Sequence, residues 1–193
     1  MDEDAATAEV GPDLVTAARK GDSAAFVAIM RHYDRRLRVV AYQAVRDRSL
    51  ADDVLQEVAI KAFRNLPRFR GDSSLGTWLS RITWRAALDA LEREKRAGRE
   101  RAERVAQADP PRVVHDPDIA GHIALRDAVE AALAGLPPHL RLTVLLVDRE
   151  GYDYAAVGRI LDVPEGTVAS RLSTARSALR LSLASFVSSE VRQ

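Results

Sequence analysis

Cysteine is absent from this chain, which excludes both a disulfide framework and a thiolate metal site. Only four histidines occur among the 193 residues, and they do not have the spacing of metal ligands. No glycine-rich phosphate loop, nucleophile elbow or Ser/His/Asp arrangement stands out either. We therefore expect neither a metal nor a cofactor, and these absences disfavour a helical metal-dependent enzyme.

Long apolar runs are also missing. None approaches the roughly 18 residues that a membrane-spanning helix needs. The charged side chains among the first eighteen residues are all acidic, which is the reverse of a secretory signal. These two absences predict a cytoplasmic protein with no membrane insertion.

Glycine and proline are sparse, with 10 and 8 residues, and clusters of strand-forming residues are rare. Every long segment instead repeats its apolar residues at the helical period, which predicts an all-α fold. We expect helices over residues 12–46 with a break near Gly21, over 49–66, from 75 past 91, and over 120–134, 139–149, 154–161 and 165–184.

The segment 97–118 contains three prolines and few large apolar side chains, so we interpret it as a flexible linker. It would join two small helical domains, residues 12–96 and 119–186. Residues 61–104 carry twelve bases and six acids, a surplus of six positive charges that suits a polyanion. At ~3.4 Å per residue the linker could span at most roughly 75 Å, enough for each domain to reach its own site on one DNA duplex.

A helix-turn-helix is predicted over residues 152–172. Asp153 is placed to cap the first helix, and Pro164 and Gly166 mark the turn. Apolar residues recur along the second helix at steps of three and four, which leaves its polar residues free to enter a DNA major groove. A plain helical hairpin inside an all-α domain would show the same periodicity.

An acidic face is predicted on the helix over 49–66. Asp52 and Gln56, and likewise Asp53 and Glu57, are four residues apart and share one exposed side. Such a face could dock on a basic protein surface, chelate a divalent ion or simply be solvated.

Both tryptophans lie with several arginines in residues 68–85. Aromatic rings interleaved with cations are what unstacked nucleic-acid bases require. Because Trp78 and Ile82 are four residues apart, we expect Trp78 to be part of the core. Trp84 does not lie on the helix face shared by Trp78 and Ile82, and we expect it to reach the surface.

Four motifs in this order resemble the bacterial sigma factors of the small, two-domain extracytoplasmic-function (ECF) group. The motifs are Ala51–Val58, Phe69–Ser73 followed by Thr77–Ile82, Leu136–Arg141, and Pro164–Arg176. The resemblance covers the chain from Asp13 to Leu183 and implies a non-enzymatic initiation subunit. Its implied partners are core RNA polymerase (β′ clamp helices and β subunit), promoter DNA and an anti-sigma factor.

The resemblance also assigns roles to residues. It implies that polymerase is bound by Asp52, Asp53, Gln56 and Glu57. It implies contacts to the −10 element, where the strands are melted, by Arg70, Asp72, Ser73, Ser74, Trp78, Arg81, Trp84, Arg85 and Arg93. It implies contacts to the −35 element by Thr167, Ser170, Arg171, Ser173, Thr174 and Arg176.

The chain departs from the family at several positions. Ala169 and Thr174 stand where bases are common, and Arg85 replaces a frequent asparagine. We therefore expect −35 binding to depend mainly on Ser170, Arg171, Ser173 and Arg176. Two other classes of function remain open on the sequence alone: a stand-alone helix-turn-helix regulator, and an adaptor that binds polymerase without reading DNA.

Overall fold

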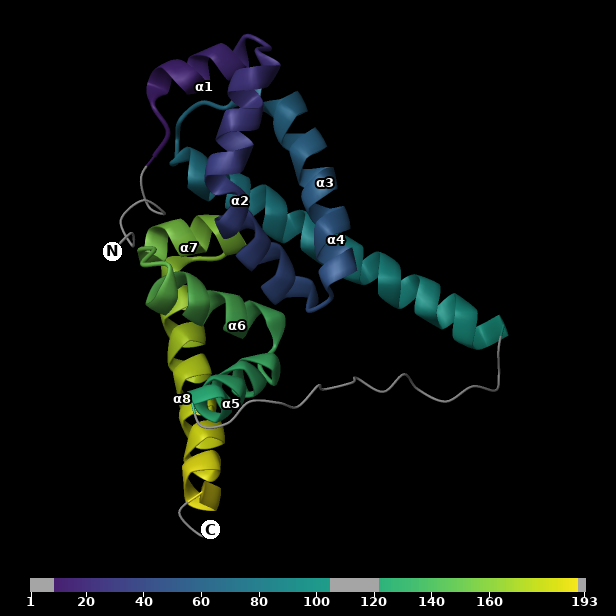
Figure 1. Ribbon diagram of the computed structural model, residues 1–193, viewed down its shortest axis with the longest axis vertical. Helices are drawn as coiled ribbons and strands as arrows, with labels where there is room; N and C mark the ends of the chain where they lie inside the picture. Colours follow the sequence, from purple (N-terminus) through teal and green to yellow (C-terminus); the bar gives the residue numbers. More distant parts are fainter. Residues whose placement is uncertain (1–8, 105–121, 191–193) are drawn as a thin grey trace.

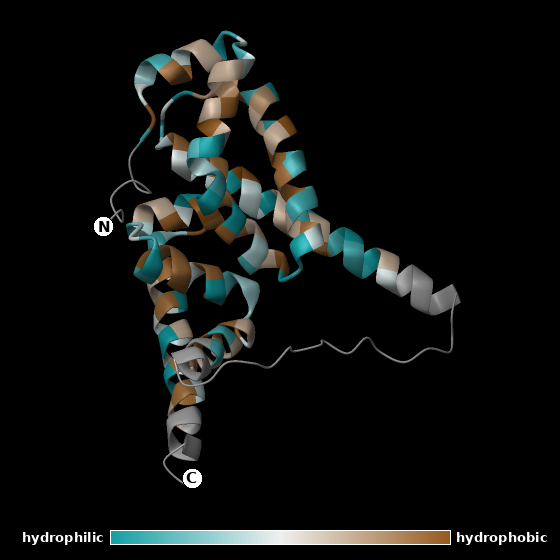
Figure 2. Cartoon of the chain, in the orientation of Figure 1, coloured by the Kyte–Doolittle hydropathy of each residue, from teal (hydrophilic) through white to brown (hydrophobic). Residues whose placement is uncertain are grey.

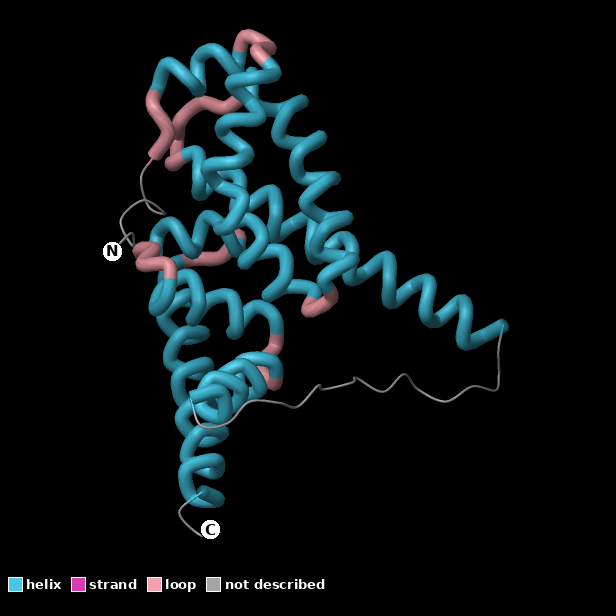
Figure 3. The backbone as a smooth tube through the Cα atoms, in the orientation of Figure 1, coloured by secondary structure: helices cyan, strands magenta, loops and turns pink. Residues whose placement is uncertain are grey.

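The computed structural model describes residues 9–104 and 122–190, with side chains placed over 9–98 and 127–184. Within these ranges the chain forms helices joined by short turns and contains no strand (Figures 1 and 3). The predicted all-α fold is therefore confirmed. None of the described helices is long and apolar enough to cross a membrane.

The first helical part consists of four α-helices and a short 3-10 turn. Their bounds are Pro12–Arg19 (α1), Ser23–Val45 (α2), Arg48–Asn65 (α3), Leu66–Arg68 (η1) and Leu75–Arg104 (α4). The side chain of Asp22 caps α2 by accepting from the amides of Ala24 and Ala25, and Asp47 caps α3 through the amide of Leu50. The break predicted near Gly21 separates α1 from α2. Helices α2, α3 and α4 pack against one another as a bundle.

Helix α4 is longer than expected, because it continues through Arg104 into the segment predicted as linker. Figure 2 shows that the last part of α4 with placed side chains is mainly hydrophilic, and Figure 1 shows that it extends away from the bundle. The remainder of the predicted linker, residues 105–118, lies outside the described residues.

The second helical part contains His122–Ala134 (α5), Pro138–Val144 (α6), a π-helical turn Leu145–Arg149 (η2), Tyr154–Leu161 (α7) and Glu165–Glu190 (α8). Helix α8 packs on α5, α6 and α7. As expected, Asp153 caps α7, its Oδ1 accepting from the Ala156 amide at 2.6 Å. The predicted apolar side of α8 is also confirmed, because Val168, Leu172 and Ala175 are buried.

The turn of the helix-turn-helix depends on Gly158. A Cβ atom at this position would lie 2.7 Å from the backbone oxygen of Val163, so only glycine allows α7 to approach the turn this closely. Asp162 then ends α7 in the left-handed conformation, with φ of 59°.

The two helical parts pack against each other. One continuous core cluster includes residues of α2, α3 and α4 together with residues of α6, η2, α7 and α8. Helix α7 lies against α4, and α6 lies against α2 (Figure 1). The helical periodicity of the sequence does not indicate this arrangement.

A buried arginine connects the two parts. Arg141 on α6 is only 3% exposed, and its Nε donates to the backbone oxygen of Gln43 on α2 at 2.8 Å. Its Nη1 donates to the Ala134 oxygen at 3.1 Å, which satisfies a carbonyl at the end of α5. Removal from water lowers the pKa of Arg141 from the ordinary arginine value, and the hydrogen bonds to carbonyls compensate part of that cost.

Candidate polymerase and nucleic-acid interface

The predicted acidic face lies on the exposed side of α3. Asp52, Asp53 and Gln56 are exposed, and Glu57 is partly buried. Asp52 is engaged locally, because its Oδ1 accepts from Nη1 of Arg38 on α2 at 2.8 Å. No partner of Asp53 or Gln56 is found among residues with placed side chains, so these two present free polar groups to solvent.

Glu57 takes part in a small charged network instead. It pairs with Lys61 at 2.6 Å and with Arg93 of α4 at 2.8 Å. The hydrogen bond from Lys61, opposed by partial burial and reinforced by Arg93, lowers the pKa of Glu57 below its usual range. Glu57 therefore joins α3 to α4 and is less available to a partner than Asp53.

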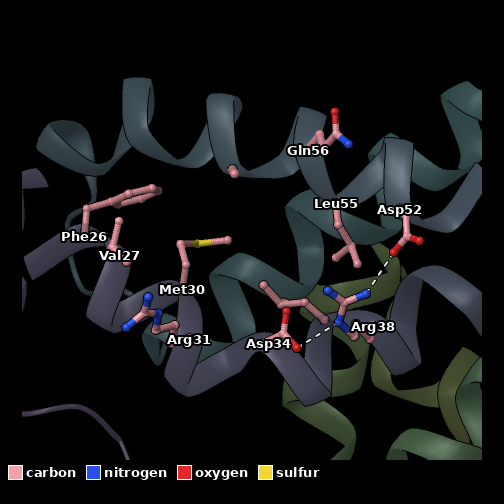
Figure 4. A pocket seen from close by; sticks show the side chains of 11 residues that line it. Phe26, Val27, Met30, Arg31, Asp34, Arg38, Asp52, Leu55 and Gln56 are labelled. Carbon is pink, nitrogen blue, oxygen red and sulfur yellow. Dashed lines mark hydrogen bonds and ion pairs between the residues drawn. The ribbon is translucent and has the colours of Figure 1, made fainter. Parts of the chain in front are cut away.

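An apolar groove runs beside this face, between α2 and α3. Figure 4 shows Phe26, Val27 and Met30 at one end and Leu55 with the Asp34–Arg38–Asp52 cluster at the other. The groove gives the acidic face an apolar neighbour, and together they have the composition of a protein-docking surface.

The loop over residues 70–74 precedes α4. Gly71 has a positive φ of 79°, which lets the chain turn sharply. Ser74 caps α4, its Oγ accepting from the Thr77 amide at 3.1 Å. Arg70, Asp72 and Ser74 are exposed, and Ser73 is partly exposed.

A second groove lies between α3 and α4 beside this loop. Its lining combines two aromatic rings, three cations and two further polar side chains: Phe69, Trp78, Lys61, Arg68, Arg85, Asn65 and Asp89, together with Ile82. The rings of Phe69 and Trp78 are 5.3 Å apart and tilted at 46°. Aromatic faces beside cations suit an unstacked base and its phosphates.

Six of the lining residues were not among the predicted site residues, and three of these six supply an aromatic ring or a cation. These three are Phe69, Arg68 and Lys61, and the first two belong to the same aromatic and basic stretch as Trp78. The signal for them was therefore present in the sequence. For Lys61 it was only the general positive charge of that region.

The prediction that Trp84 reaches the surface is wrong. Trp84 is 4% exposed and belongs to the core cluster shared by the two helical parts. Trp78 is partly buried against the core of the first part, as expected, yet it still lines the groove. Arg81 and Arg85 remain on the surface of α4, where both contact Asp162.

On α8, the predicted −35 residues lie outside the buried stripe of Val168, Leu172 and Ala175. Ser170, Ser173 and Thr174 are exposed, whereas Thr167 and Arg171 are partly exposed. The Ser170 hydroxyl donates to the Thr167 oxygen, and the Thr174 hydroxyl donates to the Ser170 oxygen. Arg176 is held by Asp148 through two hydrogen bonds of 2.6 and 3.1 Å. Arg171 is the first cation of α8. Unlike Arg176, it forms no ion pair with any residue whose side chain is placed.

Two family models match these parts of the chain. Residues 29–97 match the family described as Sigma-70 region 2, and residues 126–179 match the family described as Sigma-70, region 4. The first match covers most of the bundle, with all of the α3–α4 groove and all of the α2–α3 groove except Phe26 and Val27. The second match covers the helix-turn-helix. The two regions in this order define an RNA polymerase sigma factor.

Curated relatives identify the group. The ECF RNA polymerase sigma factor SigM of Mycobacterium tuberculosis is 35% identical over 171 residues, covering 86% of this chain and 81% of the relative. The RNA polymerase sigma-H factor of Pseudomonas aeruginosa is 33% identical over 180 residues, covering 90% of this chain and 93% of the relative. The ECF RNA polymerase sigma-E factor of Escherichia coli is 32% identical over 173 residues, covering 86% and 90%. The chain belongs to the ECF family of RNA polymerase sigma factors.

Solved structures share its fold. CnrH, in complex with the cytosolic domain of CnrY, gives a TM-score of 0.63 at 23% identity and covers 90% of this chain and 96% of that one. The sigma factor RpoE of Bartonella quintana, in complex with the anti-sigma factor NepR, gives a TM-score of 0.59 at 24% identity. This match covers 78% of this chain and 91% of RpoE. Family membership confirms the resemblance drawn from the four motifs. The chain is a non-enzymatic initiation subunit that directs RNA polymerase to promoters through regions 2 and 4.

Proposed function

We propose that this sigma factor divides promoter recognition between two domains. Residues 12–96 bind core polymerase and the −10 element, residues 119–186 bind the −35 element, and residues 97–118 link them. The observation that carries the proposal is the α3–α4 groove, where Phe69 and Trp78 lie among the cations Lys61, Arg68 and Arg85. The rings stack on a base extruded from the −10 element, and the cations bind the phosphates of the opened strand.

The acidic face of α3 docks on the β′ clamp helices of the polymerase. Asp53 and Gln56 supply the principal polar contacts because they have no competing partner among residues with placed side chains. Asp52 and Glu57 contribute less, since each is already paired within the protein. The apolar groove beside them adds buried area to the interface.

Helix α8 enters the major groove of the −35 element. Arg171, Ser170 and Ser173 make the contacts to DNA, supported by Thr167 and Thr174, while Asp148 fixes the orientation of Arg176. A cytoplasmic anti-sigma factor restrains the protein. Support for this partner comes from CnrH, solved in complex with the cytosolic domain of CnrY, and from RpoE, solved in complex with the anti-sigma factor NepR.

Reconstitution with core RNA polymerase tests the proposed function. We expect the purified chain to direct the enzyme to discrete transcription starts on genomic DNA, each preceded by two spaced sequence elements. Tight operator binding without polymerase would instead identify a stand-alone regulator. Polymerase binding without initiation would identify an adaptor.

Replacing Asp53 and Gln56 together by alanine is expected to weaken core polymerase binding by roughly 30-fold or more. The change removes one charged and one neutral hydrogen-bonding group from the docking surface, and hydrogen bonds of these kinds contribute on the order of 1–3 kcal/mol each. Affinity is measured by titrating labelled sigma factor with core enzyme.

Asp13→Asn serves as the control for this experiment, because Asp13 is an exposed acid on α1 and not on the α3 face. It should leave the affinity for core enzyme unchanged. Equal affinity of the Asp53/Gln56 double variant and the unaltered protein would contradict the docking assignment.

A further inference from the structure

Asp162 links the helix-turn-helix to the surface of α4 that the proposed function assigns to the −10 element. The carboxylate of Asp162 extends from the end of α7, where it accepts from Nη2 of Arg81 at 3.0 Å and from Nη2 of Arg85 at 2.9 Å. Arg85 also lines the α3–α4 groove, beside Trp78. A carboxylate of the second domain therefore accepts hydrogen bonds from two guanidinium groups that the proposed function assigns to DNA binding.

Tyr152 adds a second contact on the same side of α4. Its ring packs against Arg36 of α2, whose guanidinium carbon lies 4.8 Å from the ring centre. Its hydroxyl lies 3.5 Å from the hydroxyl of Ser80 on α4. Burial raises the pKa of Tyr152 above its ordinary value, which agrees with a ring inserted between the two parts.

Apolar packing completes the closed arrangement. Trp84 of α4 shares the core cluster with Val157, Ile160 and Leu161 of α7, and all four are buried. The α4 surface that bears Ser80 and Trp84 is thus covered by α7 and the loop before it. Arg81 and Arg85 at its edge contact Asp162 at the end of α7 and stay partly exposed.

We propose that the second domain acts as an internal competitor for promoter DNA, with the Asp162 carboxylate occupying the place of a backbone phosphate on Arg81 and Arg85. The free sigma factor is held closed, and polymerase binding separates the domains so that α4 meets the −10 element while α8 reaches the −35 element. This inference rests on the proposed function, because it requires the α4 surface to be a DNA-binding surface.

The contacts are suited to reversible closure. The side chains of Arg81, Arg85 and Asp162 remain 40%, 54% and 61% exposed, so solvent and salt screen the pairing and keep it weak. Each guanidinium has more donors than Asp162 uses, but a phosphate and this carboxylate cannot both occupy the same position. A small change in relative affinity is therefore enough to shift the equilibrium between the closed and open states.

Asp162→Asn tests the competition, because asparagine keeps the side-chain shape and tolerates the left-handed conformation while removing the charge. The absence of cysteine allows spin labels at introduced cysteines, at Arg64→Cys on α3 and Arg180→Cys on α8, both of which are exposed. We expect the variant to shift the label-to-label distances of the free chain toward longer values. We also expect it to bind a −10 single strand about 3- to 10-fold more tightly.

Glu165→Gln is the matched control. It removes one negative charge three residues further along the chain, at an exposed position that forms no ion pair with Arg81 or Arg85. We expect this variant to keep the short distances and the original affinity. Short distances in Asp162→Asn, or an affinity no higher than that of Glu165→Gln, would overturn the proposal.

A third variant separates this inference from the proposed function. Trp78→Ala alters the groove but not the Asp162 contacts. If the −10 strand bound equally well to Trp78→Ala and to the unaltered chain, the proposed role of the groove would fail. The distance measurement, which uses no DNA, would still decide whether Asp162 holds the domains closed.

Discussion

Trp84→Ala is expected to destabilise the protein by about 3–5 kcal/mol, the usual cost of replacing a buried tryptophan by alanine. The Trp84 side chain is 4% exposed in the core cluster shared by the two helical parts, so its removal leaves a cavity that the neighbours fill only in part. Chemical denaturation monitored by circular dichroism measures the effect as a lower transition midpoint.

Leu88→Ala is the control for this prediction. Leu88 is an apolar residue of the same helix that is 36% exposed, so its truncation should shift the midpoint much less. If Trp84→Ala and Leu88→Ala were equally mild, Trp84 would not be a core residue. Any loss of promoter binding by Trp84→Ala then has to be compared with its loss of stability, because an unfolded helix α4 cannot bind DNA.

The error over Trp84 has a physical cause. Helical periodicity identifies a buried face by assuming that a helix has only one. In this helix the face with Trp78 and Ile82 is the one predicted to be buried. Helix α4 has a second covered side, because α7 packs onto it. Ser80 and Thr83 are fully buried there, and the Thr83 hydroxyl donates to the Leu79 oxygen at 2.9 Å. Small residues of this kind allow close approach of another helix, and they were the available signal.

The helices themselves could be predicted well because their signals are local. Caps at Asp22, Asp47 and Asp153 and the turn around Gly158 depend on residues close in sequence. The packing of the two parts depends on pairs such as Arg141 with Gln43, which are 98 positions apart. Helical periodicity cannot predict a contact between residues so far apart in the sequence.

The same distinction applies to the candidate site. Asp52, Asp53, Gln56 and Glu57 could be grouped from their spacing alone, and the pairing of Glu57 with Lys61 follows from the same four-residue rule. The engagement of Asp52 by Arg38 and of Arg176 by Asp148 joins different elements, so the sequence could not indicate which of these charged groups are free.

Trp78→Ala is expected to reduce formation of the open promoter complex by roughly 5- to 150-fold, while polymerase binding stays intact. Stacking of a base on an aromatic side chain contributes about 1–3 kcal/mol, and this range corresponds to the stated fold-change. Trp78 provides the larger of the two rings in the α3–α4 groove, next to Phe69 at 5.3 Å. Permanganate reactivity of unpaired thymines at the −10 element measures the open complex directly.

Two further variants distinguish stacking from a general loss of structure. Trp78→Phe keeps an aromatic face and should retain most of the open complex, because stacking requires a π-surface and not the indole nitrogen. Phe63→Ala removes another aromatic ring, one that is 42% exposed on α3 and packs against Phe26 away from this groove. It should leave melting unchanged.

If Trp78→Phe were as defective as Trp78→Ala, the tryptophan would act through its packing against the first core and not by holding a base. Similar melting by Trp78→Ala and the unaltered protein would show that the extruded base is held elsewhere, with the exposed 70–74 loop then the nearest alternative on this end of α4.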